Sequence, residues 1–183
     1  MVAIGLQALD SVDQNLFRYE RSVLESAEIW RVLTGHFIHL GWSHLLLNMS
    51  VFLIFWYLFQ DLFSNRVWVF TILFCALGIS VFFLFFDTVL QDYVGFSGVL
   101  HGLFFIAAII TVDSYRKTQT TPFPWESGIL LIAILLKITY EQIAGPVELT
   151  QKASGGDVIV NAHLFGVIMG LILFIPFRKK TSA

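Results

Sequence analysis

Long apolar runs, separated by shorter polar segments, dominate the sequence. The five runs are residues 44–60, 67–86, 97–112, 125–143 and 158–177. Most of them approach the roughly 20 residues that an α-helix needs to cross a bilayer, whereas the apolar start Met1–Leu9 is too short. A polar segment of mixed charge covers residues 10–43. The pattern predicts one all-α domain over residues 1–183, a polytopic membrane helical bundle with a large first extramembrane loop that contains short interfacial helices.

The composition agrees with a bilayer as the solvent of this chain. Hydrophobic residues make up 57% of the sequence and charged residues 13%, whereas a soluble domain has about 25% charged residues. The 19 phenylalanines suit lipid-facing helix surfaces. The net charge is −2 and the basic run is confined to Arg178–Lys180, so no nucleic-acid partner is expected. The single cysteine, Cys75, excludes an intramolecular disulfide and multi-cysteine metal clusters.

Lysine and arginine residues set the expected orientation, because cytoplasmic loops are enriched in them. By helix parity Arg66, Arg116, Lys117 and the tail Arg178–Lys180 fall on one side of the membrane. We assign that side, and with it the C-terminus, to the cytoplasm. The sequence shows no basic start and cleavage site of the kind that marks a signal peptide.

Three polar residues from separate helices are expected at one depth, near the outer ends of their helices. They are His44, Ser97 and His163. Small residues four positions apart, such as Gly98 and Gly102, let two membrane helices approach closely, and Gly166 lies one turn after His163. Such an approach brings a serine hydroxyl to an imidazole at about 2.6–3.2 Å, where the imidazole can remove its proton. The pattern therefore favours nucleophilic catalysis by Ser97 with His163 as the base.

The surroundings of Ser97 favour the stabilisation of an oxyanion. A serine at a helix start has free backbone N–H groups beside it, that of Gly98 included. His44 and Asn48 are spaced i, i+4 and face the same side of the first span, so their N–H donors can complete the site. The third run, 97–112, is short for a bilayer, which favours a cavity near Ser97 because lipid does not satisfy free N–H groups.

At these residues the sequence resembles the rhomboid family of intramembrane serine proteases. The matching stretches are Trp30-Arg31, His39-x-x-x-x-His44-x-x-x-Asn48, Gly95-x-Ser97-Gly98 and Ala162-His163-x-x-Gly166-x-x-x-Gly170. The resemblance implies that Ser97 is the nucleophile and His163 the base of a catalytic dyad, while His44 and Asn48 support the oxyanion. It also implies a membrane-anchored protein substrate, cut near the outer membrane face. No Asp or Glu is expected to complete the dyad.

The run Leu100-His101-Gly102 resembles the rhombosortase branch of that family. Those bacterial enzymes process proteins that carry a C-terminal Gly-Gly tail, an apolar helix and a basic end, so the resemblance implies the bacterial inner membrane and substrates of this kind. His101 stands where rhomboids usually have a tyrosine that packs beside the catalytic histidine. Together with Gly95, Gly102 and Gly166 it is expected to support the site.

The helix count and the function class each leave alternatives. Rhomboids usually have a complete helix before the first loop, where this sequence has Met1–Leu9, so five or six membrane helices are expected. One competing class is a non-catalytic rhomboid-like protein that binds client transmembrane helices, although such proteins lack the serine or the histidine. Another is a small transporter, which would favour repeated halves with broken helices.

Two further polar pairs receive structural interpretations. His36 and His39 are three residues apart, as in some metal sites, but no cysteine or carboxylate joins them on that turn, so we interpret them as loop packing. Lys137 and Glu141 are spaced i, i+4 near the outer end of their helix. We interpret them as a pair that reaches toward the membrane interface rather than as a proton relay. No metal and no cofactor are expected.

Overall fold

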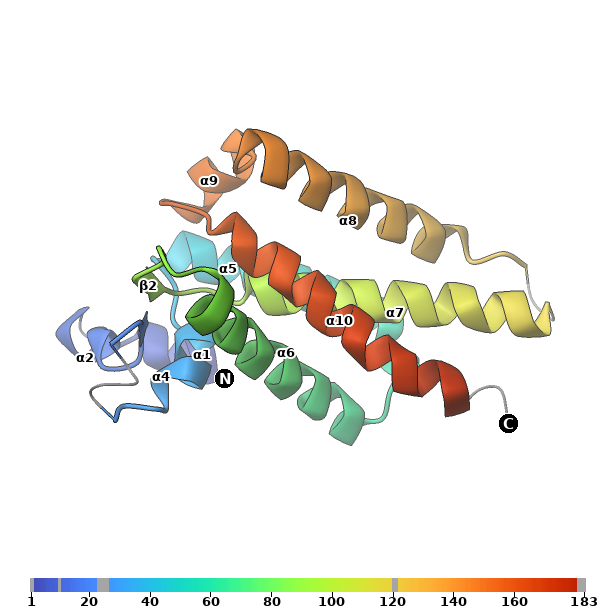
Figure 1. The fold of residues 1–183 in the computed structure, drawn as a ribbon, viewed down its shortest axis with the longest axis horizontal. Coiled ribbons are helices and arrows are strands. Elements are labelled where there is room, and N and C mark those ends of the chain that lie inside the picture. The colour runs from blue at the N-terminus through green and yellow to red at the C-terminus, as the bar shows by residue number, and fades with distance from the viewer. Residues whose placement is uncertain (1, 10, 23–26, 120–121, 181–183) are drawn as a thin grey trace.

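Five long helices form the body of the molecule. The computed structural model describes residues 2–9, 11–22, 27–119 and 122–180. The long helices are α5 (Trp42–Phe59, continued by the 3₁₀ turn η2, Gln60–Leu62), α6 (Asn65–Phe86), α7 (Ser97–Thr118), α8 (Trp125–Ala144) and α10 (Val160–Lys180). All five are long and apolar enough to cross a membrane, and they run between the same two ends of the molecule (Figure 1). The predicted all-α membrane bundle is confirmed, with five candidate spans among the described residues.

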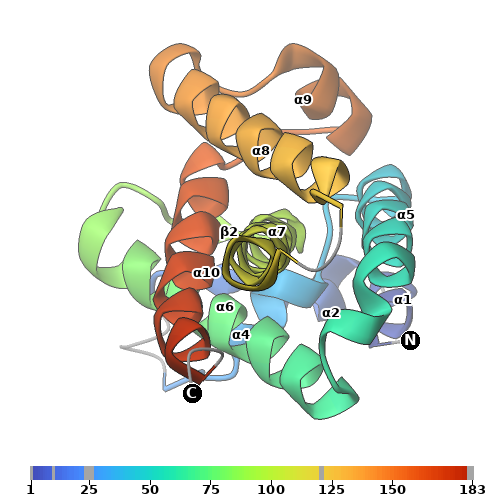
Figure 2. The same cartoon turned by 90° about the vertical axis from the view of Figure 1, so that its right-hand side faces the viewer.

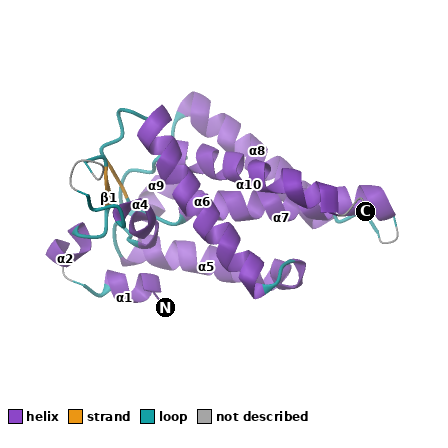
Figure 3. Ribbon diagram, turned by 60° about the horizontal axis from the view of Figure 1, so that its bottom comes forward, coloured by secondary structure: helices purple, strands orange, loops and turns teal. Residues whose placement is uncertain are grey.

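The shorter elements gather at one end of the bundle (Figure 1). From the first loop they are α1 (Val2–Gln7), α2 (Ser11–Asn15), β1 (Tyr19–Glu20), α4 (Arg31–Thr34) and the 3₁₀ turn η1 (Gly35–Phe37), and from the later loops β2 (Asp92–Tyr93) and α9 (Glu148–Ser154). Strand β1 pairs antiparallel with β2, with Tyr19 opposite Tyr93 and Glu20 opposite Asp92 (Figure 3). This pairing ties the first loop to the segment that leads into α7.

Arg21 fastens the first loop to the end of α6. Its Nη1 donates to the carbonyl oxygens of Phe83 and Asp87 at 3.0 Å, and its Nη2 donates to that of Leu84 at 2.8 Å. The last carbonyl oxygens of a helix receive no hydrogen bond from within the helix, so they need donors from outside it. The guanidinium supplies those donors and fixes the loop over this end of the bundle.

Helix α7 lies at the centre of the bundle, with α5, α6, α8 and α10 around it (Figure 2). Half of its most apolar window is buried inside the protein, compared with 44% for α10, 22% for α8 and 17% for α5. The outer faces of α5 and α8 are therefore left for lipid. Ser97 is the first residue of this central helix, and it lies at the end of the bundle where the shorter elements gather (Figure 1).

Glycines allow α7 and α10 to touch along their backbones. A Cβ on Gly98 would lie 2.7 Å from the carbonyl oxygen of Ala162, and a Cβ on Gly102 would lie 2.7 Å from that of Gly166. Because real Cβ atoms essentially never approach closer than 3.0 Å, these positions need glycine. Small residues at membrane helix crossings act in this way generally.

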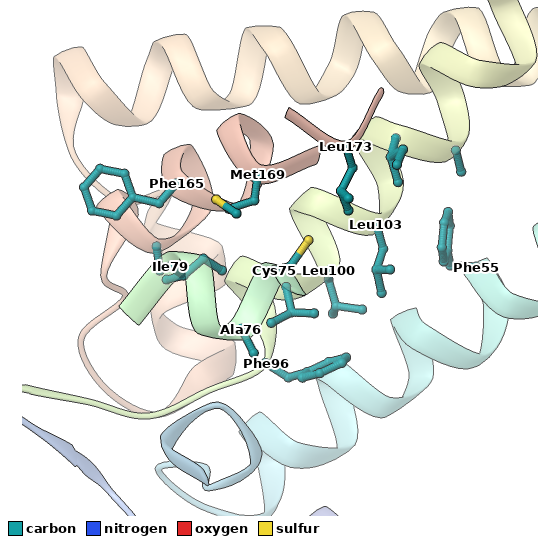
Figure 4. Packing of buried hydrophobic residues seen from close by; sticks show 14 of the residues in the cluster. Phe55, Cys75, Ala76, Ile79, Phe96, Leu100, Leu103, Phe165, Met169 and Leu173 are labelled. Carbon is teal, nitrogen blue, oxygen red and sulfur yellow. The ribbon is translucent and has the colours of Figure 1, made fainter. Parts of the chain in front are cut away.

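Below this crossing the helices share an apolar core. Figure 4 shows Cys75 of α6 beside Leu100 and Leu103 of α7 and near Met169 of α10. The Cys75 thiol is free and fully buried. Phe55 extends the cluster to α5. This core holds α6, α7 and α10 together and so positions the residues at the N-terminal ends of α7 and α10.

The structure corrects the expected length of the third span. Helix α7 continues to Thr118 rather than ending near Val112, because Asp113 and Lys117 form an i, i+4 ion pair at 2.7 Å instead of opening a loop. Gln119 then ends the helix in a left-handed conformation. The third span is therefore not short, and the premise from which a cavity near Ser97 was expected was wrong. Helix α9 was also not predicted, because it lies in the polar segment between the apolar runs 125–143 and 158–177.

Candidate active site

Ser97 and His163 meet where the N-terminal ends of α7 and α10 pack together. Ser97 is the first residue of α7 and His163 lies in the first turn of α10. The Ser97 Oγ is 3.0 Å from Nε2 of His163, which is a hydrogen-bond distance. The His163 side chain is 1% exposed. The two residues that the sequence proposed as nucleophile and base are therefore brought within reach of proton transfer.

The backbone before Ser97 needs glycine for two reasons. Gly95 has a φ of +125°, a conformation that L side chains rarely adopt, and a Cβ there would lie 2.8 Å from Cε1 of His44. The Gly95 N–H donates to the carbonyl oxygen of Gly35, and its own carbonyl accepts from the Tyr93 hydroxyl at 2.6 Å. Burial raises the pKa of the Tyr93 phenol well above its usual value, so this hydroxyl stays a donor. These contacts fix the direction in which the chain enters α7.

Glu141 of α8 reaches the other ring nitrogen of His163. Its Oε2 lies 2.8 Å from His163 Nδ1, and its side chain is fully buried. The expectation that no carboxylate partners the histidine was therefore wrong. Helix α8 packs against both α7 and α10, and it presents Glu141 inward.

Lys137 belongs to the same cluster. Its Nζ lies 2.5 Å from Glu141 Oε1 and 3.2 Å from His163 Nδ1. The interpretation of Lys137 and Glu141 as a pair that reaches toward the interface was also wrong, because the carboxylate points into the protein. The sequence did contain a signal for this role: an ionisable residue inside a membrane span is a candidate functional group by default.

His101 stacks on the base. The ring centroids of His101 and His163 are 4.1 Å apart with planes inclined by 22°. The His101 Nδ1 lies 2.7 Å from the main-chain carbonyl oxygen of Ser97, so it donates its proton there. As expected, the ring lies beside His163, and its Nδ1 is occupied by a backbone bond.

His44 and Asn48 line the same cavity as Ser97. The His44 Nδ1 accepts a long 3.5 Å contact from the Leu40 N–H, which leaves the ring proton on Nε2. One N–H of the Asn48 amide donates to the carbonyl of His44 at 3.2 Å, and its second N–H remains as a donor. The Gly98 N–H lies in the first turn of α7, where backbone donors have no acceptor within the helix. The oxyanion role of these three residues stays a prediction.

A cavity of about 520 Å³ opens beside the pair. Ser97, His163 and Lys137 are among its polar lining residues, while most of its surface is apolar, with contributions from α5, α7 and α8. Helix α9 contributes Leu149 and Ala153. The cavity thus combines a largely apolar wall with a small set of polar groups, which is the usual make-up of a ligand site.

His36 and His39 lie outside this chemistry. His36 Nε2 is 3.0 Å from the Ser80 hydroxyl, and the His39 ring packs edge-on against His44. Burial lowers the pKa of His36 to about 3 and that of His39 to about 4, so both rings are neutral at ordinary pH. Within the described part of the chain no three His, Cys, Asp or Glu side chains are grouped to hold a metal ion.

Comparison with known proteins gives one family. The model of the Rhomboid domain family matches residues 26–180, which include all five candidate spans and every residue of the site. No curated protein matches the sequence. The matched range covers most of the chain, from before α4 to the end of α10.

Proposed function

The chain belongs to the rhomboid family of intramembrane proteases, and on this basis we propose that it is a serine endopeptidase that cuts membrane-anchored proteins with Ser97 and His163. It is an integral, multi-pass membrane protein of a family that acts on membrane-protein substrates in the bilayer. The observation that carries the proposal is the 3.0 Å contact between Ser97 Oγ and His163 Nε2 in the lining of a largely apolar cavity.

The proposed reaction follows from this contact. Ser97 Oγ attacks the carbonyl carbon of the scissile peptide bond while its proton passes to His163 Nε2. The imidazolium then gives that proton to the leaving amine, and an acyl-enzyme on Ser97 remains. Water attacks this ester with His163 again as the base, and the release of the acid restores the serine. In both halves of the reaction, His163 Nε2 takes a proton from the attacking group and gives it to the leaving group.

Stabilisation of the oxyanion is assigned to donors around Ser97. They are the Nε2–H of His44, the free N–H of the Asn48 amide and the backbone N–H of Gly98. A donor of this kind contributes most when it is fixed in a site that excludes water. The support is that His44 and Asn48 line the Ser97 cavity from α5, whereas His163 comes from α10, on the other side of α7 (Figure 2).

For the substrate we propose membrane-anchored proteins with a C-terminal apolar anchor, including those with a Gly-Gly tail. The support is the run Leu100-His101-Gly102 and the largely apolar cavity, which suits an apolar membrane anchor. His101 occupies the place beside the base where the family usually has tyrosine. This assignment places the protein in a bacterial inner membrane.

The C-terminus is assigned to the cytoplasm and the active site to the outer face. Lys117 Nζ donates to the carbonyl oxygen of Arg178, so both residues lie at the end of the bundle opposite Ser97. A cluster of basic residues at one end favours the cytoplasmic side. The side chains of Lys179 and Lys180, which belong to the predicted basic tail, lie outside the described residues.

A fluorophosphonate probe tests the catalytic proposal without knowledge of the substrate. The purified protein is expected to be labelled, and Ser97→Ala is expected to lose labelling and proteolysis while keeping its thermal midpoint. Ser114→Ala is the matched control, because Ser114 is exposed near the other end of the same helix. Labelling of Ser97→Ala at the wild-type rate would remove Ser97 as the nucleophile, whereas a folded wild-type protein that is not labelled would favour the non-catalytic, client-binding alternative.

The substrate proposal has a separate test in cells. In a strain that lacks the protein, proteins with Gly-Gly tails should keep their C-terminal anchors, and expression of the wild-type chain should restore cleavage. Normal processing of all such proteins in the deletion strain would remove the tail specificity while leaving the protease.

A further inference from the structure

Two groups of α8 approach the same nitrogen of His163. Nδ1 lies 2.8 Å from the Glu141 carboxylate and 3.2 Å from the Lys137 ammonium. A ring nitrogen of a neutral imidazole carries either a proton or a lone pair. It donates to the carboxylate in the first case and accepts from the ammonium in the second. The two contacts are therefore alternatives for hydrogen bonding.

The choice between them fixes the form of the base. When Nδ1 carries the proton and donates to Glu141, Nε2 has a lone pair that accepts from the Ser97 hydroxyl. When Nδ1 instead accepts from an ammonium, the proton sits on Nε2, which donates to Ser97 Oγ and has no capacity to remove its proton. The first tautomer is competent for attack and the second is not.

We propose that Glu141 is a positioning residue that selects the competent tautomer of His163 and keeps Lys137 from imposing the other one. The inference rests on the proposed function and adds a third member to the serine–histidine pair. The geometry supports it through both carboxylate oxygens, since Oε2 accepts from Nδ1 while Oε1 is bound by Lys137 Nζ at 2.5 Å. The ammonium is thereby held on the carboxylate.

The burial of the three groups agrees with this role. The side chains of Glu141 and His163 are 0% and 1% exposed, and that of Lys137 is 30% exposed. A buried carboxylate needs a nearby positive partner, which Lys137 supplies. During attack the Ser97 proton moves to Nε2, the imidazolium still donates from Nδ1, and Glu141 stays ionised. No other proton transfer is required.

Turnover of a model transmembrane substrate tests the proposal against a purely structural ion pair. Glu141→Gln leaves Lys137 free to donate to Nδ1, and kcat is expected to fall by about 10²–10⁴ with KM changed by less than about threefold. Adding Lys137→Met to Glu141→Gln removes the competing donor. The double variant is expected to recover at least about tenfold of the lost kcat, because an uncharged pair leaves both tautomers available.

Asp113→Asn is the matched control. Asp113 also pairs with a lysine four residues away on a membrane helix, but it lies near the C-terminal end of α7, far from Ser97. Its kcat is expected to equal that of wild type. The proposal is overturned if Glu141→Gln keeps wild-type kcat, or if the double variant is no faster than Glu141→Gln.

The tautomer itself is read from ¹⁵N NMR of histidine-labelled wild-type protein, with the His163 signals assigned by their absence in His163→Ala. A protonated Nδ1 and a bare Nε2 are expected at neutral pH, and the opposite pattern overturns the inference even if Glu141→Gln fails to fold. This measurement does not depend on proteolysis. If Ser97→Ala still cuts, the proposed function fails; if Ser97→Ala is inactive but Nε2 carries the proton, this inference alone fails.

Discussion

Gly102→Ala should slow the enzyme by separating two helices at a point about one and a half turns away from the nucleophile. A Cβ at this position would lie 2.7 Å from the Gly166 carbonyl oxygen on α10 and 2.8 Å from the Cys75 Sγ on α6. Ordinary van der Waals contact begins at 3.4 Å, so α7 and α10 have to part by about 0.7 Å. The contact with the buried Cys75 sulfur is a second overlap, which the shift of α7 also has to relieve.

The same displacement acts on the reacting atoms. The Ser97 Oγ to His163 Nε2 distance of 3.0 Å would grow to about 3.7 Å, outside the range of about 2.6–3.2 Å in which nucleophile and base are coupled. A misplacement near 1 Å can reduce the rate by about 10²-fold, so we expect a loss of about 10- to 100-fold. Overpacking costs about 1–3 kcal/mol, partly offset by about 1 kcal/mol from the better helix propensity of alanine.

The assay is the rate of fluorophosphonate labelling in detergent, corrected for the folded fraction, together with the thermal midpoint. Gly128→Ala is the control because it makes the same change in a membrane helix, where the new Cβ meets the Phe123 ring at 3.1–3.2 Å instead of a backbone carbonyl. It should label at the wild-type rate. If Gly102→Ala labels as fast as Gly128→Ala, the backbone contact does not set the distance between serine and histidine.

Three further outcomes are expected. His101→Tyr should lose less than the roughly 10²-fold that removal of an acid–base group causes, and an inactive variant would make this ring part of the proton transfer. His44→Ala and Asn48→Ala should each slow labelling, by up to about 10²–10³-fold, without abolishing it; full speed in both would make them structural. The thermal midpoint should fall as the pH drops from about 7 to 4, because burial holds the pKa of His36 at about 3 and that of His39 at about 4, below the ordinary 6.5. Between those values the unfolded chain binds more protons, so stability present above pH 6.5 is lost and then levels off below the folded-state pKa values; a constant midpoint would contradict this.

The spans and the pairing of serine with histidine could be predicted because their signals are local. Apolar runs report helices that face lipid, and the small residues around Ser97 and His163 report where two such helices cross. Neither inference needs knowledge of how the remaining helices are arranged. The contact at 3.0 Å follows once α7 and α10 pack glycine to glycine.

An ionisable residue inside a span, such as Glu141, signals a functional role, but the sequence does not show which residue of another helix it contacts. A surface helix of a soluble domain shows its buried face by an apolar stripe opposite its polar residues. On α8 both the lipid-facing side and the inward-facing side carry apolar residues, so the sequence does not distinguish them. Which side carries Lys137 and Glu141 depends on how α8 rotates against α10. The charges at Asp113 and Lys117 misled in the opposite way, since they mark the end of the apolar layer and not the end of the helix.

The pairing of β1 with β2 makes completion of the site a long-range event in folding. Arg18 and Asp92, which form an ion pair beside this ladder, are 74 residues apart in sequence, and α5 and α6 lie between them. A newly synthesised first loop therefore has no strand partner until two spans have been inserted and Tyr93 has emerged. Contacts of such high contact order form late. The segment that directs Ser97 toward its base would then be fixed only after the helices are in place, so a partly inserted chain would carry no active protease.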